Sequence, residues 1–349
     1  MKSAWAGIQL EKLNRLLDSV WERNSFYTRK WREAGVNARQ LSSLEDLAKF
    51  PFTTRDELLA DQNTAPPLGS NLTCAPPDYK HIHHSSGTTR APLFWADTTQ
   101  SWQWVVHCSQ ALYELAGIES KDRIFFAMPL GASSGGWILH EGAVRLGCCC
   151  FTAGQAEATE LLRWIQNFQP NVLIGKPSRL LALAIAAQDA GTSPRSLNVQ
   201  KLLLTGEPSR QMLRPQLEEL WGAECFDRYG LTEAGSVACE CSEHLGGMHV
   251  LESEFLVEVI DPATTNPAND GEPGELVLTN LGRFARPIIR YRTGDCVRLL
   301  RQHRCRCGRT GAFLQGDVAR CTMKNDAGAE PCSTVFRHLK AALARSSSC

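Results

Sequence analysis

The middle of the chain alternates between helical patterns and short apolar runs, and this alternation restricts the fold more than any other feature. The helical patterns cover residues 98–116, 135–147, 157–168, 178–190 and 209–221. The apolar runs are RIFFAM, CCCFT, NVLIG, KLLLT and ECFDRY. Strands that are joined through helices are typical of crossover units on a parallel sheet. The sequence therefore predicts an α/β fold in which helices flank a mostly parallel sheet.

Strand patterns without helices follow Gly246. They cover residues 248–261, 274–281 and 288–300. A turn rich in Pro, Asn and Gly lies at 266–274, and such hairpin-joined runs predict a β-barrel-like subdomain attached to the α/β body. Ahead of the alternation, residues 1–80 read as helices and connections, and Thr54 with Glu57 matches a capping box.

Composition excludes several classes of protein. Because 37 basic residues balance 37 acidic ones, no overall field draws the chain to nucleic acid or to an anionic membrane. The apolar stretch at 180–187 is too short to span a bilayer, and charges at Glu11 and Lys12 interrupt any secretory signal. We therefore expect a cytoplasmic protein with neither nucleic-acid nor membrane partners. Its 14 cysteines are then expected to be reduced thiols or metal ligands, with 148–150 as small buried residues.

Four short stretches carry residues that suit a bound nucleotide. They are HHSSGTTRAP (83–92), LLLTGEPS (202–209), DRYGLTEAG (227–235) and RPIIRYRTGD (286–295). In the first, Gly87 lets the backbone turn so that N–H groups and neighbouring hydroxyls can face one anion. The second follows an expected strand, and nucleotides bind where parallel strands end. Each stretch alone is also compatible with an ordinary turn or helix start.

Together, in this order, the four stretches resemble those of the adenylate-forming superfamily, and within it the phenylacetate-CoA ligase branch. The similarity runs from about Leu10 to Phe313 and includes connecting text such as SGGWILHEGAVRLG and FQPNVLIGKPSRLL. The resemblance implies an acid-thiol ligase with a large adenylation domain. In such an enzyme a carboxylate attacks the α-phosphate of ATP, and a thiol such as coenzyme A then takes the acyl group.

The resemblance also implies roles for individual residues. The expected ATP contacts are Ser85, Ser86, Gly87, Thr88, Thr89, Gly206, Glu207, Pro208, Tyr229, Gly230, Asp295 and Arg309. Among these, Tyr229 would stack on adenine and Asp295 would accept hydrogen bonds from the ribose hydroxyls. The expected catalytic pair is Thr232, which would reach the α-phosphate, and Glu233, which would hold Mg²⁺. From the residues alone, Glu207 could instead begin a helix, and Thr232 with Glu233 could cap one.

The aromatic acid is expected near Trp137 and His140, with Lys176 close by, because the family binds its acid at the matching segments. Trp137 could stack on a ring, although a core tryptophan is an equally good interpretation. In the segment 101–107, Trp102 or Trp104 is expected to pack in the core and not to contact the ligand.

Three thiolates and one imidazole suit a closed tetrahedral zinc site. Cys241, His249, Cys305 and Cys307 are the expected ligands, and members of the branch carry a structural Zn²⁺ at matching positions. Cys239 is the alternative to Cys241 as the first zinc ligand. Spare reduced cysteines remain the alternative.

The sequence departs from the family pattern at two places. Arg90 and Ala91 replace the usual Gly and Lys of the phosphate loop, which leaves a cation of different shape there. Asp317 stands where the family hinge has arginine, and neither Lys324 nor Lys340 matches the family's catalytic lysine. We therefore expect the C-terminal lid domain to be largely absent. Whether the chain carries out the thioester-forming step is not decided by the sequence.

The expected organisation has four parts: a helical N-terminal segment (1–80), an α/β body that binds ATP and acid (81–245), a β subdomain with the zinc site (246–316) and a remnant of the lid (317–349). The expected function is ATP- and Mg²⁺-dependent adenylation of an aryl or arylalkyl carboxylic acid. Coenzyme A, an amine or a carrier protein would accept the acyl group, and a homodimer is the family's usual state. The alternative is a noncatalytic or split-enzyme relative that binds nucleotide and needs a separate chain for the lid.

Overall fold

The computed structural model describes residues 5–36, 39–85, 91–207 and 213–321. Contacts group the chain into one compact unit, Met1–Ala319, and a second, Arg320–Cys349. All that follows concerns the first unit. The helix expected at 334–344 lies outside the described residues.

An N-terminal group of helices precedes the sheets. It consists of α1 (Ala6–Val20), α2 (Ser25–Glu33), η1 (Leu44–Lys49), α3 (Arg55–Thr64) and η2 (Pro76–Asp78). Trp31 of α2 is fully buried, stacks on Trp21 and meets Phe50 edge to face at 5.1 Å between ring centroids. Thr54 and Glu57 form the expected capping box at the start of α3. Aromatic packing of this kind anchors the helices to one another.

The predicted alternation of strands and helices is confirmed. Its strands are β3 (Arg123–Phe126), β4 (Cys149–Thr152), β5 (Val172–Gly175), β6 (Lys201–Leu204) and β7 (Glu224–Leu231). Its later helices are α5 (Ser134–Leu146), α6 (Ala158–Phe168), α7 (Pro177–Asp189), η3 (Pro194–Leu197) and α8 (Arg214–Trp221). The strands pair in parallel in the order β7-β6-β5-β3-β4. Their carboxyl ends therefore share one edge of the sheet.

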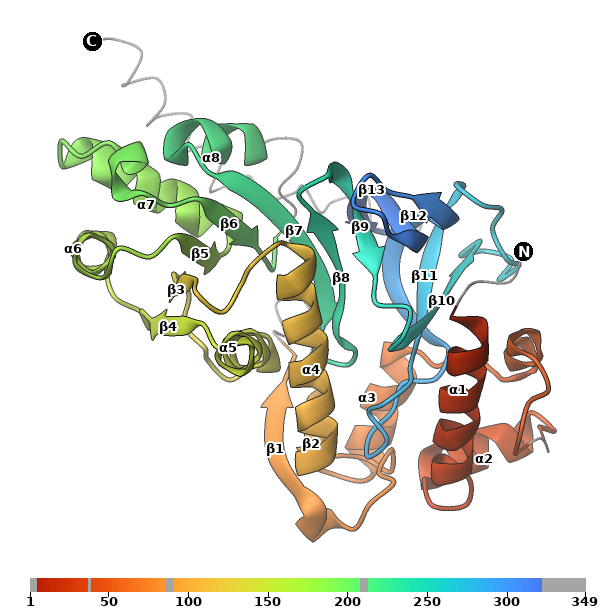
Figure 1. Cartoon of the computed structure of the whole chain (residues 1–349). Coiled ribbons are helices and arrows are strands. Elements are labelled where there is room, and N and C mark those ends of the chain that lie inside the picture. Colours follow the sequence, from red (N-terminus) through yellow and green to blue (C-terminus); the bar gives the residue numbers. More distant parts are fainter. Residues whose placement is uncertain (1–4, 37–38, 86–90, 208–212, 322–349) are drawn as a thin grey trace. The chain divides into compact units, whose positions relative to one another are not determined.

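The strands after β7 continue the same sheet in antiparallel fashion. They are β8 (Gly235–Cys241), β9 (His244–Val250), β10 (Phe255–Ile260), β11 (Pro273–Asn280), β12 (Tyr291–Arg304) and β13 (Thr310–Arg320). The full order is β10-β11-β12-β13-β9-β8-β7-β6-β5-β3-β4 (Figure 1). Strand β7 pairs in parallel with β6 and antiparallel with β8, so it joins the two halves. The division at 245/246 stays a prediction, and hydrogen bonding runs across it without a break.

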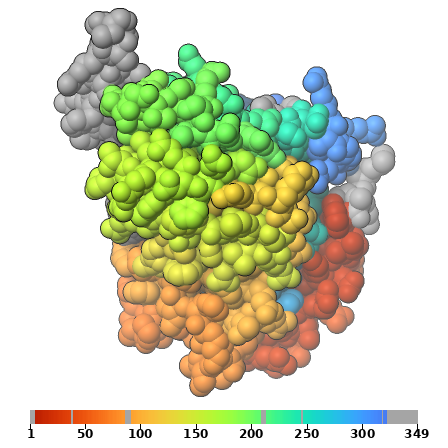
Figure 2. Space-filling view, turned by 60° about the vertical axis from the view of Figure 1, so that its left-hand side comes forward, coloured from red at the N-terminus to blue at the C-terminus, as the bar shows by residue number. Residues whose placement is uncertain are grey.

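A separate two-stranded sheet carries the SSGTT loop. Strands β1 (Tyr79–His84) and β2 (Phe94–Thr98) pair antiparallel, and the loop joins them. Helix α4 (Thr99–Leu115) follows β2 directly, and the Thr98 hydroxyl accepts a hydrogen bond from the Ser101 N–H at its start. Figure 1 shows this hairpin at the foot of α4. Figure 2 shows the yellow-green residues of α5 to α7 forming a continuous surface above the orange N-terminal residues.

The expectation that residues 148–150 are all buried holds for Cys148 alone. Cys148 is buried, whereas Cys150 is half-buried and Cys149 is exposed. The reason is that β4 is the outermost strand of the sheet, so it has a neighbour on one side only. Among the described residues, no cysteine forms a disulfide.

The capping box gives a prediction for stability. The Thr54 hydroxyl accepts a bond from the Glu57 N–H at 3.2 Å, and the Glu57 carboxylate accepts one from the Thr54 N–H at 2.8 Å. We expect Thr54→Ala to lower the free energy of unfolding by about 1 kcal/mol in a urea titration. Thr64→Ala, at the other end of α3, is the control and should cost less than about 0.5 kcal/mol. Equal losses would contradict this role for Thr54.

Candidate active site

The structure brings Tyr229 and Asp295 together, although 66 residues separate them in the chain. The Tyr229 hydroxyl donates a 2.7 Å hydrogen bond to Asp295 Oδ2. Tyr229 lies on β7 and Asp295 on β12, and both are buried. The Asp295 N–H bonds the Thr293 hydroxyl at 3.1 Å, which fixes the backbone at that point. A buried carboxylate is thus held beside an aromatic ring.

Arg283 holds the turn that contains Thr232 and Glu233. Its Nη1 donates to the carbonyl oxygens of Thr232 and Glu233 at 2.8 and 2.9 Å. Its Nε donates to Asp97 Oδ1 at 2.7 Å, and its Nη2 donates to the other oxygen of the same carboxylate. Both side chains of this ion pair are 0% exposed. Because the guanidinium is planar and rigid, four bonds from it fix the turn against Asp97.

Asp97 belongs to β2, the strand that leaves the SSGTT loop. Trp95 of the same strand lies against two guanidinium groups, Arg283 at 5.3 Å and Arg286 at 4.7 Å from the ring. Burial lowers the pKa of Arg286 to about 10. This packed group therefore ties the loop-bearing strand to the Thr232–Glu233 turn.

The two ends of the stretch 83–92, His83–Ser85 and Ala91–Pro92, belong to the described residues. Ser85 accepts hydrogen bonds at its hydroxyl from Arg55 at 3.0 Å and from the Leu93 N–H at 3.1 Å. Arg55 also donates to the Ala91 carbonyl at 3.0 Å, on the far side of the loop. The remaining expected contacts in the loop, Ser86, Gly87, Thr88 and Thr89, lie outside the described residues. Arg55 was not found from the sequence, because its contacts with the loop leave no local signal in α3.

The second motif ends β6 next to helix α7. Gly206 has a φ of +80°, which favours glycine, and Glu207 Oε2 accepts a 3.2 Å bond from the Ser178 N–H in the first turn of α7. Glu207 Oε1 lies 3.7 Å from Lys176 Nζ. The carboxylate thus lies at a helix N-terminus, where the helix dipole favours it, but the helix is α7 and not the one after Glu207. Pro208 lies outside the described residues.

Gly230 allows a close approach between β7 and β8. A Cβ at this position would collide with the Gly235 carbonyl oxygen and with the Arg228 guanidinium. Glycine is therefore required there by space.

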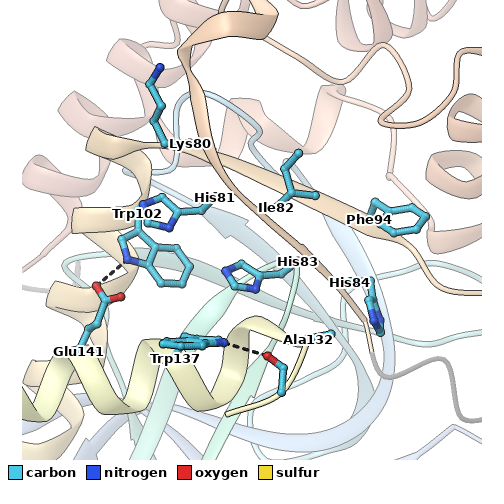
Figure 3. A pocket seen from close by; sticks show the side chains of 11 residues that line it. Lys80, His81, Ile82, His83, His84, Phe94, Trp102, Ala132, Trp137 and Glu141 are labelled. Carbon is cyan, nitrogen blue, oxygen red and sulfur yellow. Dashed lines mark hydrogen bonds between the residues drawn. The ribbon is translucent and has the colours of Figure 1, made fainter.

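Trp137 lines a cavity of about 520 Å³ between β1, α4 and α5. Its indole N–H donates to the Gly131 carbonyl at 2.9 Å, and Trp102 donates to Glu141 at 2.7 Å (Figure 3). The rings of His81 and His83 stack on Trp102, with centroids 4.4 and 5.1 Å away. Both indole N–H groups thus donate hydrogen bonds within the protein, and aromatic rings line the cavity.

The neighbouring expectations have different outcomes in the structure. His140 does not line this cavity, and its ring lies over Phe126 with centroids 5.5 Å apart. Trp102 is only 4% exposed and packs in the core as expected, but it also forms one wall of the cavity. The expectation that it does not contact the ligand stays a prediction.

The four expected metal ligands form one cluster. Their ligand atoms all lie within 4.8 Å of one another. Cys241 Sγ is 3.4 Å from His249 Nε2 and 3.6 Å from Cys305 Sγ, and Cys307 Sγ is 3.5 Å from His249 Nε2. Cys239 does not belong to this cluster, and burial raises the pKa of its thiol. Between the two competing cysteines, the geometry thus favours Cys241.

Arg309 lies in the turn that holds Cys305 and Cys307. Its carbonyl accepts a 2.9 Å bond from the Cys305 N–H, and its side chain is exposed. Arg304 is nine positions after Asp295 on β12, which corresponds to about 30 Å of extended strand. This placement gives no support to Arg309 as a contact for ATP.

Comparison with known proteins places this geometry in a family. The model of the AMP-binding enzyme family matches residues 34–284. The chain belongs to the AMP-binding enzymes. It is 34% identical over 297 residues to the phenylacetate-coenzyme A ligase of Pseudomonas putida, which covers 84% of the chain and 66% of the relative. The ligase of Thermus thermophilus is 34% identical over 306 residues, covering 87% of the chain and 67% of the relative.

Solved structures of AMP-binding enzymes agree with the fold. The 2-hydroxyisobutyryl-CoA ligase in complex with 2-HIB-AMP and CoA superposes with a TM-score of 0.86 at 28% identity, over 92% of this chain and 69% of that one. A benzoate CoA ligase from Burkholderia xenovorans shares the fold at 16% identity and a TM-score of 0.54. The chain spans about two thirds of the length of the curated relatives it matches. Among the described residues, no helix has the length and apolar character needed to cross a membrane.

The buried ion pair of Arg283 gives a second stability prediction. Arg283→Met leaves the Asp97 carboxylate buried without its cation, so we expect a loss of about 3–5 kcal/mol in the free energy of unfolding. Arg301→Met is the control, because the pair of Arg301 with Asp270 is exposed at 45% and 56%. It should change the same quantity by less than about 0.5 kcal/mol. A loss for Arg283→Met no larger than this control would refute the anchoring role.

Proposed function

We propose that this chain adenylates an aryl or arylalkyl carboxylic acid with ATP and then passes the acyl group to coenzyme A. The observation that carries the proposal is the hydrogen bond between Tyr229 and Asp295. Tyr229 lies three residues before Thr232, which begins the turn that Arg283 holds. The family supplies the reaction class, and the phenylacetate-coenzyme A ligases among its relatives supply the substrate class.

The first step joins the acid to the nucleotide. A carboxylate oxygen of the acid forms a bond to the α-phosphorus of ATP, and the bond from that phosphorus to pyrophosphate breaks. Two anions meet in this step, so their charges must be neutralised and their positions fixed. Asp295 would hold the ribose hydroxyls, Tyr229 would face the adenine, and Thr232 would bond the α-phosphate.

Glu233 is the proposed magnesium ligand. One carboxylate together with phosphate oxygens is a donor set that Mg²⁺ accepts, and the bound ion would neutralise phosphate charge. Arg283 fixes the backbone on both sides of the Glu233 N–H through its two carbonyl bonds. The backbone that carries the Glu233 carboxylate is therefore ordered.

The second step transfers the acyl group. The thiol sulfur bonds to the acyl carbon, its proton passes to solvent, and AMP leaves with the electron pair of the broken C–O bond. We assign the ring of the acid to the cavity beside Trp137, because its walls are ring faces. His140 would not contact the acid in this cavity; its ring packs against Phe126.

We also propose that Cys241, His249, Cys305 and Cys307 hold a structural Zn²⁺. Zinc bonds of about 2.3 Å to sulfur and 2.0 Å to nitrogen, at tetrahedral angles, place neighbouring ligand atoms about 3.5–3.8 Å apart. Three of the separations in the cluster, at 3.4 to 3.6 Å, lie close to this geometry, and all the ligand atoms lie within 4.8 Å of one another. The ion would fasten the β12–β13 turn to β8 and β9.

The adenylation step predicts acid-dependent exchange of labelled pyrophosphate into ATP, tested with a panel of aryl and arylalkyl acids. Glu233→Gln should lower kcat for exchange by about a hundredfold or more, because a phosphate-neutralising group loses its ligand. Glu243→Gln is the control, since Glu243 is exposed in the turn after β8. Exchange that is absent with every acid, or equal in both variants, would refute the proposed chemistry.

The metal site predicts a zinc content of about one ion per chain, measured by mass spectrometry on protein kept free of chelator. The double variant Cys305→Ser, Cys307→Ser should lose the zinc and unfold at a lower temperature. Cys296→Ser, a free cysteine of β12 outside the cluster, should keep both properties. Zinc that persists in the double variant would defeat this assignment.

A further inference from the structure

Among the described residues, Arg228 is a half-buried arginine that has no acidic partner. Its Nη1 donates to the Thr205 hydroxyl at 2.9 Å and its Nη2 to the Ser236 hydroxyl at 3.3 Å. Its Nε is buried and has no acceptor. Throughout the described part of the chain, no carboxylate lies within ion-pair distance of it. Burial accordingly lowers the pKa of this guanidinium.

Other buried arginines of the chain are paired. Arg214 bonds Glu240 at 2.8 Å, Arg290 bonds Glu258 at 2.7 Å, and Arg283 bonds Asp97. Arg286 also has no bonded carboxylate in the described residues, but it is 1% exposed and closed off by Trp95. Arg228 differs from it because the residue is half-buried, whereas Arg286 is fully buried. A buried cation without an anion costs stability, so an accessible one is suited to receive an anion from a ligand.

The position of Arg228 relates it to the nucleotide residues. It precedes Tyr229 on β7, and neighbouring side chains of a strand point to opposite faces. Tyr229 meets Asp295, whereas Arg228 lies on the face near Tyr113 of α4, whose hydroxyl bonds the Leu139 carbonyl of α5. Trp102 and Trp137 line the cavity and belong to the same two helices, α4 and α5, whereas Arg228 is not itself one of the lining residues.

The guanidinium lies beside Gly230. A Cβ on Gly230 would collide with Arg228 Nη2, and Ser236, which accepts from the same nitrogen, is the register partner of Gly230. Gly230 is two residues ahead of Thr232, and Thr232 begins the turn after β7. A group bound by Arg228 would therefore lie beside the strand that leads directly to the proposed α-phosphate contact.

We propose that Arg228 binds a second carboxylate of the substrate, so that the enzyme selects dicarboxylic acids. This inference rests on the proposed adenylation. It adds the requirement that the end of the acid that does not react carries a negative charge. The two hydroxyls of Thr205 and Ser236 hold the guanidinium without neutralising it.

The test compares matched acids in pyrophosphate exchange: phenylacetate with 4-carboxyphenylacetate, propionate with malonate, and butyrate with succinate. In the unaltered protein, the diacid of at least one pair should exceed its partner in kcat/KM by about a hundredfold. Arg228→Gln should remove this advantage and leave the monoacid within a few-fold, and Arg228→Lys should restore part of it. Equal losses for both members of each pair would overturn the proposal, because Arg228 would then meet the reacting carboxylate or act only in folding.

Thermal unfolding with each acid alone separates this inference from the adenylation itself. A diacid should raise Tm in the unaltered protein and not in Arg228→Gln, even if no acid supports exchange. Without ligand, Arg228→Gln should unfold at no lower temperature than the unaltered protein, whereas Arg214→Gln should unfold earlier because Glu240 loses its cation. Absence of any diacid preference in both assays, or a ligand-free loss as large as that of Arg214→Gln, would overturn the proposal.

Discussion

The buried ion pair between Arg283 and Asp97 is the constraint on which the candidate active site depends. It joins β2, the strand after the proposed phosphate-binding stretch, to the turn after β7, and the two residues are 186 positions apart in the chain. A charge pair with no exposure gains little over an apolar pair of the same volume, since desolvation offsets most of the attraction. What it provides is geometry, because the guanidinium bonds two carbonyl oxygens and two carboxylate oxygens at once.

Strand β7 distributes the proposed functions to two faces of the sheet. It is the strand at which parallel pairing changes to antiparallel pairing. Tyr229 projects toward Asp295 on β12, and Arg228 projects toward the helices. A one-residue slip of β7 would exchange the two faces, and with them the proposed nucleotide and acid contacts. Gly230 helps to fix the register, since any larger residue would collide with β8.

Local patterns in the sequence predict the elements well and their long-range contacts poorly. The expected helix at 135–147 matches α5, and the capping box of Thr54 is present, because both depend on residues within one or two turns. The zinc cluster also has the expected members, and there the resemblance supplied the pairing of distant cysteines. Arg55 and Arg283 were not found, since their partners lie 30 and 186 residues away and their own surroundings look ordinary. Cys149 was misjudged because a strand's position at the sheet edge depends on topology and not on its own residues.

The central claim is that one ATP molecule is held between the Thr232–Glu233 turn and Asp295. A crystal structure of the protein with Mg²⁺ and ATP tests it most directly. The account predicts ribose hydroxyls within hydrogen-bond distance of the Asp295 carboxylate and Mg²⁺ about 2.1 Å from an oxygen of Glu233. The account would be contradicted if the nucleotide bound elsewhere, with Asp295 bonded to Tyr229 and to no ribose hydroxyl.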